Sequence, residues 1–210
     1  MLCKKVSDVN VFVEPASNAW TGVSATDVDL IPTPLGMQPN DYIIAKWTDR
    51  KYGSLDRLSV SSLHDTKRIA FRMSWRDEKK DTGDGEDFPD GAALMFPVSG
   101  DPVLMTMGAE NAPVHALHWR ARKDEIRSVT VTGIGSSQRS GAVAQAVKSA
   151  WSQGVWTLVI TRDLDGPEEV ATFRPGQETR IGFAIWNGGN QERGGIKAVS
   201  PDWTAFALEA

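Results

Sequence analysis

A chain of 210 residues is long enough to bury one sizeable core, and a formal net charge of -4 argues against binding to nucleic acid or an anionic membrane. Its single cysteine, Cys3, excludes intrachain disulfides and cysteine-based zinc or iron–sulfur sites. No apolar run approaches the about 20 residues of a membrane-spanning helix, and the N-terminus lacks the apolar stretch of a secretory signal. We expect one domain over residues 1–210, either cytoplasmic or exported with a partner.

The first half of the chain predicts short strands separated by turns. Residues 68–75 alternate most clearly, with Ile69, Phe71 and Met73 on one face. Residues 11–20 are interpreted as a short strand and a proline-led turn, and residues 31–35 as an extended proline-rich connector. Further strands are predicted at residues 42–47, 58–60, 91–98, 103–107 and 112–121.

Residues 77–90 contain seven acidic residues and two glycines, which favours a solvent-exposed loop. The Asp-x-Asp-x-Asp-Gly spacing of a calcium loop is absent there. A metal site in this loop is therefore not predicted.

The second half continues the short-strand pattern. Strands are predicted at residues 127–132, 181–186 and 203–208. Residues 143–150 could form a short helix, but the Ser-Gln-Gly turn between Trp151 and residues 155–160 favours a β-hairpin. Recurrent short strands with no long helical period predict an all-β fold, an antiparallel β-sandwich or Greek key with few short helices.

A glycine-rich stretch follows the strand at residues 181–186. It carries Gly188, Gly189, Gly194 and Gly195, and Lys197 stands just beyond the last pair. Glycine adopts backbone angles closed to other residues, so the stretch is either a long surface excursion or a loop that wraps a ligand and directs Lys197 at it. An isolated lysine is usually a solvated surface cation.

Histidines and methionines are the other candidate ligands. His115 and His118 are three residues apart and would point to opposite faces of a strand, so a zinc pair is not expected; surface or structural roles are favoured for both and for His64. Met95 has the setting of a core residue. Met107 is followed by Gly108 and could approach a flat ligand closely, and thioether sulfur is a known axial ligand of haem iron.

Three segments together resemble the haem-b-binding γ subunits of ethylbenzene dehydrogenase and of the related dimethyl-sulfide dehydrogenase, selenate reductase and chlorate reductase complexes. They are residues 88–98, residues 107–114 with 118–121, and residues 183–200, and the third is the most specific. The likeness extends over most of the chain in the same order. It implies a β-sandwich that holds one non-covalent haem b.

The resemblance places the family's axial methionine and lysine ligands on Met107 and Lys197. Met105 lies two residues from Met107 on the same face of the predicted strand and is the competing methionine. Ala116 and His118 stand where the family has aromatic residues, and His118 is a competing ligand ranked below Lys197.

The resemblance also implies partners: an α subunit with a molybdenum cofactor and a β subunit with iron–sulfur clusters. This chain would be a non-catalytic electron-transfer subunit of the heterotrimer, passing electrons to an external acceptor such as a cytochrome c. Export to the periplasm would use a twin-arginine signal on a partner. The alternative is a carbohydrate-binding β-sandwich whose eight tryptophans stack on sugars, and a third option is a subunit that has lost its haem.

Overall fold

The computed structural model describes residues 1–85 and 87–210, and these residues are mostly β-structure. The strands are β1 (Leu2–Lys5), β2 (Thr26–Asp29), β3 (Ile31–Pro32), β4 (Arg57–His64), β5 (Arg68–Arg76), β6 (Gly91–Pro97), β7 (Val114–Arg120), β8 (Glu125–Val131), β9 (Gln138–Arg139), β10 (Ala144–Ser152), β11 (Val155–Asp163), β12 (Glu178–Trp186), β13 (Ala198–Val199) and β14 (Thr204–Leu208). The helices are α1 (Asp41–Trp47) and the 3-10 turns η1 (Val9–Phe12), η2 (Asn18–Trp20), η3 (Leu35–Met37) and η4 (Arg122–Asp124).

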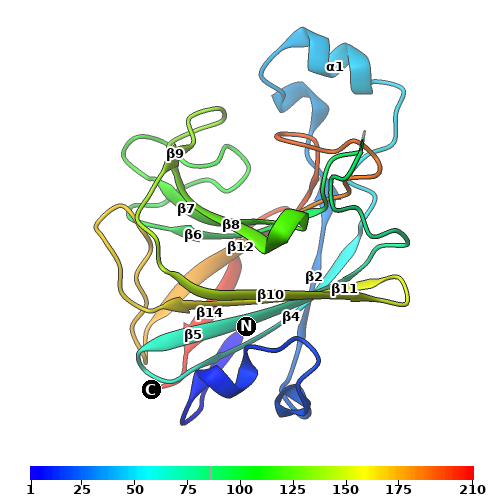
Figure 1. The fold of residues 1–210 in the computed structure, drawn as a ribbon. Helices are drawn as coiled ribbons and strands as arrows, with labels where there is room; N and C mark the ends of the chain where they lie inside the picture. The colour runs from blue at the N-terminus through cyan, green and yellow to red at the C-terminus, as the bar shows by residue number, and fades with distance from the viewer. Residues whose placement is uncertain (86) are drawn as a thin grey trace.

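The strands form two packed layers (Figure 1). One layer runs β10-β11-β5-β4, and the other runs β12-β6-β7-β8-β9. Strands β1 and β14 connect them, and β1 is parallel to both β14 and β4, whereas the strand pairs within the two layers are antiparallel. The prediction of a mainly antiparallel β-sandwich is therefore confirmed, with β1 as a parallel strand that the sequence did not indicate.

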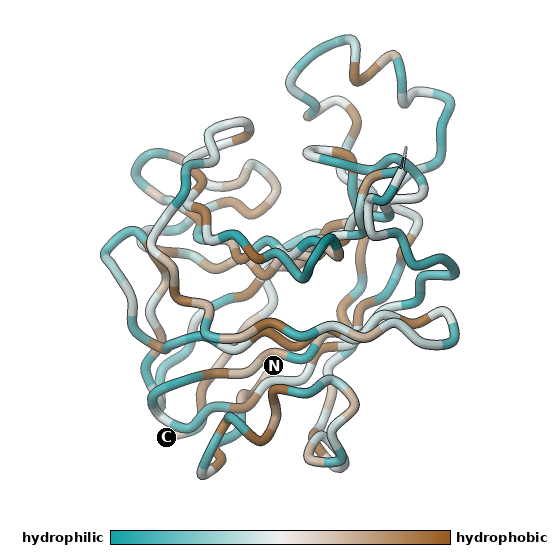
Figure 2. The backbone as a smooth tube through the Cα atoms, in the orientation of Figure 1, coloured by the Kyte–Doolittle hydropathy of each residue, from teal (hydrophilic) through white to brown (hydrophobic). Residues whose placement is uncertain are grey.

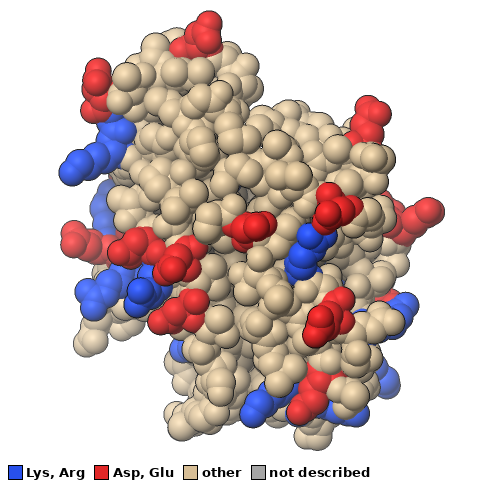
Figure 3. All heavy atoms as spheres, turned by 180° about the vertical axis from the view of Figure 1, so that it is seen from behind, with Lys and Arg blue, Asp and Glu red and all other residues tan. Residues whose placement is uncertain are grey.

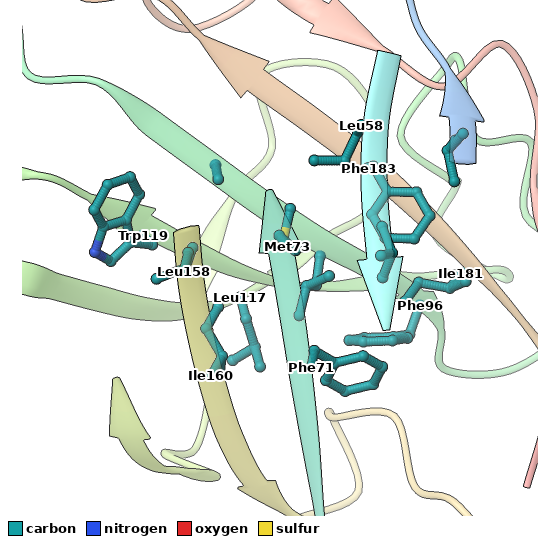
Figure 4. Packing of buried hydrophobic residues seen from close by; sticks show 14 of the residues in the cluster. Leu58, Phe71, Met73, Phe96, Leu117, Trp119, Leu158, Ile160, Ile181 and Phe183 are labelled. Carbon is teal, nitrogen blue, oxygen red and sulfur yellow. The ribbon is translucent and has the colours of Figure 1, made fainter. Parts of the chain in front are cut away.

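Alternation along the strands fills the space between the layers. The close view in Figure 4 shows Phe71 and Met73 of β5 and Leu158 of β11 opposite Phe96 of β6 and Phe183 of β12. Figure 2 shows hydrophobic colour concentrated along the strands and hydrophilic colour in many of the surrounding loops. The period-two pattern predicted at residues 68–75 and 181–186 is thus confirmed, because Phe71, Met73 and Phe183 all lie in this core.

The hairpin prediction is also confirmed. Strands β10 and β11 pair across a tight turn, with Ser152 opposite Val155 and Trp151 opposite Trp156. Trp156 in turn pairs with Trp75 of β5, so tryptophans line up across neighbouring strands. These three tryptophans form cross-strand pairs, with Trp75 and Trp156 buried in the core and Trp151 half-buried against it.

Two predicted strands are helical instead. Residues 42–47 form α1, because the Asn40 side chain accepts a hydrogen bond from the Ile43 N–H (3.0 Å) and caps the first turn. Residues 11–20 contribute to η1 and η2, whose Phe12 and Trp20 rings meet edge-to-face at 5.3 Å over the β4–β5 layer. Capping by nearby side chains therefore determined the structure of these two segments, although their apolar content had predicted strands.

Helix α1 has seven residues, and no helix in residues 1–85 and 87–210 is long and apolar enough to cross a membrane. On the face shown in Figure 3, acidic and basic side chains are interspersed over an uncharged background. That face carries no continuous basic field of the kind that binds nucleic acid.

Candidate functional site

The outer face of the β12-β6-β7-β8 layer, turned away from the main core, carries a second apolar cluster. We call it the outer apolar face; its buried members are Ala93, Met95, Leu104, Val114, Ala116, Ala184 and Val199. Strand register places Ala184, Ala93 and His118 in one row and Gly182, Met95, Ala116 and Val129 in the next. Several of these side chains are small and apolar, and Leu104 from the segment between β6 and β7 packs over Gly182.

Segments on two sides of this face carry the candidate ligands. Met105 and Met107 belong to the segment between β6 and β7, and both are half-buried against the outer apolar face. Lys197 ends the excursion between β12 and β13, beside the opposite end of the face near Trp186. Figure 1 shows both segments on the outer side of the β6–β7–β12 layer. The sequence-predicted residues therefore lie around one apolar surface.

The methionine segment is a turn and not the predicted strand. The Met107 N–H donates to the Leu104 carbonyl (2.9 Å), and the Gly108 N–H donates to the Val103 carbonyl (3.1 Å). This pair of bonds is a Schellman-type closure with Met107 at the left-handed position, φ 59°, where glycine is usual. The strand prediction for residues 103–107 is wrong because this closure, completed by Gly108 at φ 79°, turns the chain back.

Met107 is held in this unfavourable conformation from both sides. Its N–H is bonded within the turn, and its carbonyl accepts from the Gly133 N–H (3.0 Å) after β8. A non-glycine residue in the left-handed region costs on the order of 1 kcal/mol, and such strain gathers at functional positions. Met105 and Met107 do not share a strand face, because both lie in this turn.

Lys197 is almost fully buried, with 8% of its surface exposed. Burial lowers the pKa of its amine from the ordinary 10.5 to about 8, and no carboxylate of the described residues offsets that effect. The Nζ atom lies 5.4 Å from the centre of the Trp186 ring and 3.4 Å from the Gly194 carbonyl. The expectation of a solvated surface lysine is therefore wrong, and the amine is brought toward its neutral form.

The backbone of Lys197 is fixed by distant parts of the chain. Its carbonyl accepts from the Thr33 N–H (3.0 Å) and from the Thr33 hydroxyl (3.2 Å) in the proline-rich connector. A side chain at Gly53 would meet that same carbonyl at 2.7 Å. Thr33 and Gly53 are positioning residues that sequence reasoning missed, since each lies more than a hundred residues from Lys197 in sequence.

The glycine-rich loop is organised by one buried carboxylate, Glu192. It accepts from the Gly53 N–H (2.8 Å), the Asn187 N–H (3.0 Å) and the Asn190 amide (3.0 Å). Gly188 packs so tightly against the Phe88 carbonyl that a side chain there would clash. At Gly188 the close approach is therefore to the protein's own backbone.

The acidic loop before β6 supports the same excursion. Asp90 is fully buried and accepts from the Gly188 N–H (2.9 Å), the Asp81 N–H (2.8 Å) and the Trp156 indole (3.0 Å). Asp77 and Asp81 are also buried, so the prediction of a solvent-exposed loop is wrong for these three residues. Backbone and indole donors explain why the Asp90 carboxyl group is tolerated in a buried position.

A cleft of about 650 Å³ opens beside these carboxylates, on the other side of the excursion from the outer apolar face. Asp77, Asp81, Asn187 and Glu192 line it, and neither Met107 nor Lys197 does. Burial, followed by the charge of Asp90, raises the pKa of Asp77 to about 7. The polar residues that line the cleft therefore support the glycine-rich loop, and the cleft is not part of the candidate ligand site.

We expect Asp77→Asn to flatten the dependence of stability on pH. The folded chain keeps the Asp77 proton up to about pH 7, whereas the unfolded chain releases it near 3.8. Folded protein therefore binds more protons in that window, and wild-type stability falls as pH rises through it. At pH 8 the variant should be more stable by on the order of 2 kcal/mol, a value discounted because water reaches the cleft.

Urea unfolding at a series of pH values tests this expectation. Asp29→Asn is the control, because Asp29 is exposed and its nearest cation, Arg57, is 3.9 Å away. Equal pH slopes for the wild type and Asp77→Asn would contradict a raised pKa at Asp77.

The histidines behave as the strand geometry predicts. His115 is fully buried on the inner face of β7, where its Nε2 lies 2.9 Å from the Ser128 hydroxyl. His118 is half-buried on the outer side, with its ring 4.8 Å from that of Trp186. Burial, reinforced by Arg120, Arg127 and Lys197, lowers the pKa of His118 to about 4. No cluster of three histidine, cysteine or acidic ligands occurs in the described residues.

Taken together, the fold and the site define a β-sandwich module with a methionine and a buried lysine placed around an apolar sheet face. Solved structures of similar fold include a family 9 carbohydrate-binding module from Caldicellulosiruptor kristjanssonii in complex with glucose, at TM-score 0.60 and 8% identity over 100% of this chain and 95% of that one. A Bacteroides uniformis protein described as carbohydrate-binding gives TM-score 0.59 at 11% identity over 100% and 98%. At these identities the likeness shows the fold alone.

The chain belongs to the ethylbenzene dehydrogenase family, whose model matches residues 17–133 and 126–198. It is 33% identical to a Haloferax mediterranei protein named as a respiratory nitrate reductase haem subunit, over 92% of this chain and 67% of the relative. It is 33% identical to the chlorate reductase γ subunit of Ideonella dechloratans over 70% and 63%. It is 28% identical to the dimethylsulfide dehydrogenase γ subunit of Rhodovulum sulfidophilum, over 90% of this chain and 73% of the relative. The resemblance drawn from the three segments is confirmed.

Proposed function

We propose that this chain is a haem b electron-transfer subunit of a molybdenum and iron–sulfur oxidoreductase complex, and not a catalyst in its own right. One curated relative is named as a haem subunit and two others as γ subunits of reductase or dehydrogenase complexes. The chain spans between 63% and 73% of the length of these relatives. The observation that carries the proposal is the buried amine of Lys197 at the outer apolar face.

The residues present fit a haem. Metal ligation requires a neutral amine, and burial already brings the Lys197 pKa to about 8. The small side chains of Ala93, Ala116 and Ala184 offer an apolar floor for a flat macrocycle. The strained backbone at Met107 presents a thioether from another segment on the same side of the layer. We assign Met107 and Lys197 as the axial ligands.

Haem b, when bound, supplies a carrier of single electrons. The chain's own residues position the ligand atoms and exclude water from them. Thr33 fixes the Lys197 backbone, and Trp186 covers the amine. Met107 and Lys197 would hold the iron, and the thioether would raise its reduction potential while the two protein ligands would leave no coordination position for substrate. These features favour electron transfer over substrate chemistry.

The partners proposed are a molybdenum-containing α subunit and an iron–sulfur β subunit, with an external acceptor such as a cytochrome c. We place the complex in the periplasm, exported in the folded state on a partner's twin-arginine signal. Cell fractionation together with affinity purification through this chain tests both parts. Recovery of the chain alone from the cytoplasm would overturn them.

The spectrum of the purified protein tests the haem itself. We expect a Soret band and a reducible, low-spin, six-coordinate signature, with about one haem per chain by pyridine haemochrome assay. A colourless protein that is retained on cellulose or another polysaccharide would instead support the carbohydrate-binding alternative.

The positions of the tryptophans argue against the carbohydrate-binding alternative. Five are buried in the described structure: Trp20, Trp47, Trp75, Trp119 and Trp156. The other three are half-buried, and their indole N–H groups donate to the carbonyls of Asp77, Gly194 and Pro102. A stacking platform for sugars needs an open aromatic face, and the described residues present no exposed tryptophan.

A further inference from the structure

Two arginines share one carboxylate at the β7–β8 edge of the outer apolar face. We call Arg120, Glu125 and Arg127 the edge cluster. Glu125 lies 2.6 Å from an Arg120 terminal nitrogen through one oxygen and 2.8 Å from an Arg127 terminal nitrogen through the other. Both oxygens of the single carboxylate are therefore engaged, and the cluster keeps one uncompensated positive charge.

Strand register places this charge beside the candidate site. Arg127 continues the row that runs from Ala184 through Ala93 and His118, and Arg120 lies opposite Gly91 in the adjacent row. The charges of Arg120, Arg127 and Lys197 all act on the ring of His118. Three cations and one carboxylate thus surround the end of an otherwise apolar floor, in a chain whose net charge is -4.

The arginines are held in place but remain accessible. Their side chains are 31% and 40% exposed, which leaves guanidinium edges open to a ligand. The Arg120 Nε is buried and has no hydrogen-bond partner among the described residues, an arrangement that costs free energy unless a further acceptor satisfies it. Glu125 orients both guanidinium groups without neutralising them.

Guanidinium groups at the rim of an apolar floor suit an amphipathic ligand with carboxylates at one edge. Arginine binds carboxylate through paired, charge-assisted hydrogen bonds, and water is only partly displaced at this exposure. We propose that the edge cluster binds the propionate carboxylates of the haem, with Arg127 as the main contact and Arg120 as its neighbour. This inference rests on the proposed function.

Haem dimethyl ester separates the carboxylate contact from the rest of the binding, because esterification removes both negative charges and retains the macrocycle. The whole chain, purified and freed of bound haem, would be titrated with haem b and with the ester. We expect the wild type to favour haem b by about tenfold to a hundredfold, the range of one or two charge-assisted hydrogen bonds. Arg127→Gln should lose most of that preference by binding haem b more weakly, with ester affinity unchanged.

Arg57→Gln is the matched control, because Arg57 is exposed on β4 and its nearest carboxylate, Asp29, is 3.9 Å away. It should keep the wild-type preference. Equal affinities of the wild type for haem b and ester would overturn the inference, as would a parallel loss of both in Arg127→Gln with a wild-type unfolding curve. A wild type that takes up neither compound would overturn the proposed function as well, so the two failures are distinct.

Discussion

Replacing Lys197 with alanine is expected to abolish the low-spin, six-coordinate spectrum and to weaken haem retention by more than about a hundredfold. Residues that merely orient a metal ligand cost about 10- to 100-fold when removed, and loss of a ligand should exceed that range. Absorption and electron paramagnetic resonance spectra of the variant check the coordination. Transfer of haem to an excess of apomyoglobin measures the retention.

A second substitution at position 197 is expected to raise the stability of the haem-free protein. A gain in stability would exclude misfolding as the cause of the haem loss. In haem-free protein the buried cation is unfavourable, since a pKa lowered from 10.5 to about 8 corresponds to roughly 3 kcal/mol at neutral pH. Lys197→Leu keeps most of the packing and removes that cost, so the haem-free variant should be more stable than the wild type. Lys46→Ala, at an exposed position in the last turn of α1, is the neutral control. An unchanged spectrum in Lys197→Ala would contradict the assignment of Lys197 as an iron ligand.

Replacing Met107 with glycine should lower the reduction potential by on the order of 100 mV, because the thioether that raises it is lost. Met107 sits at φ 59°, so glycine also relieves backbone strain of about 1 kcal/mol, which offsets part of the packing lost with the half-buried side chain. Potentiometric titration and urea unfolding measure the two effects separately. A potential that falls while stability stays close to that of the wild type identifies Met107 as the ligand.

Met105→Ala is the matched comparison, since Met105 is half-buried in the same segment and packs on the same face. It should leave the potential and the spectrum close to the wild type. If Met105→Ala lowers the potential and Met107→Gly does not, the axial methionine is Met105. Either outcome decides between the two residues.

Sequence patterns predicted those parts of the fold that depend on neighbours along the chain. The two-residue period over residues 68–75 and 181–186 determined which side chains face the core, and Phe71 and Phe183 lie there. Residues 42–47 were misassigned because the cap from Asn40 was not weighed against their apolar content. The burial of Asp90 could not be predicted, because its donors Trp156 and Gly188 are brought to it by the fold.

The candidate site also has features that the sequence indicated and features that only the fold creates. Resemblance to a family indicated Met107 and Lys197, and nothing in the local sequence distinguished Lys197 from an ordinary surface lysine. What makes it unusual is contact with residues far along the chain: Thr33 is 164 residues away, and the Gly53–Glu192 bond that anchors its loop spans 139 residues. Such contacts have no signature in spacing or composition.

The parallel strand β1 has a consequence for the timing of folding. Leu2 and Cys3 pair with Ala207 and Leu208 of β14, so this side of β1 stays unpaired until β14 has been synthesised. Closing a loop of that length costs entropy before any contact repays it, and non-local pairing of this kind slows folding. The two layers can therefore join through β1 and β14 only after β14 has left the ribosome.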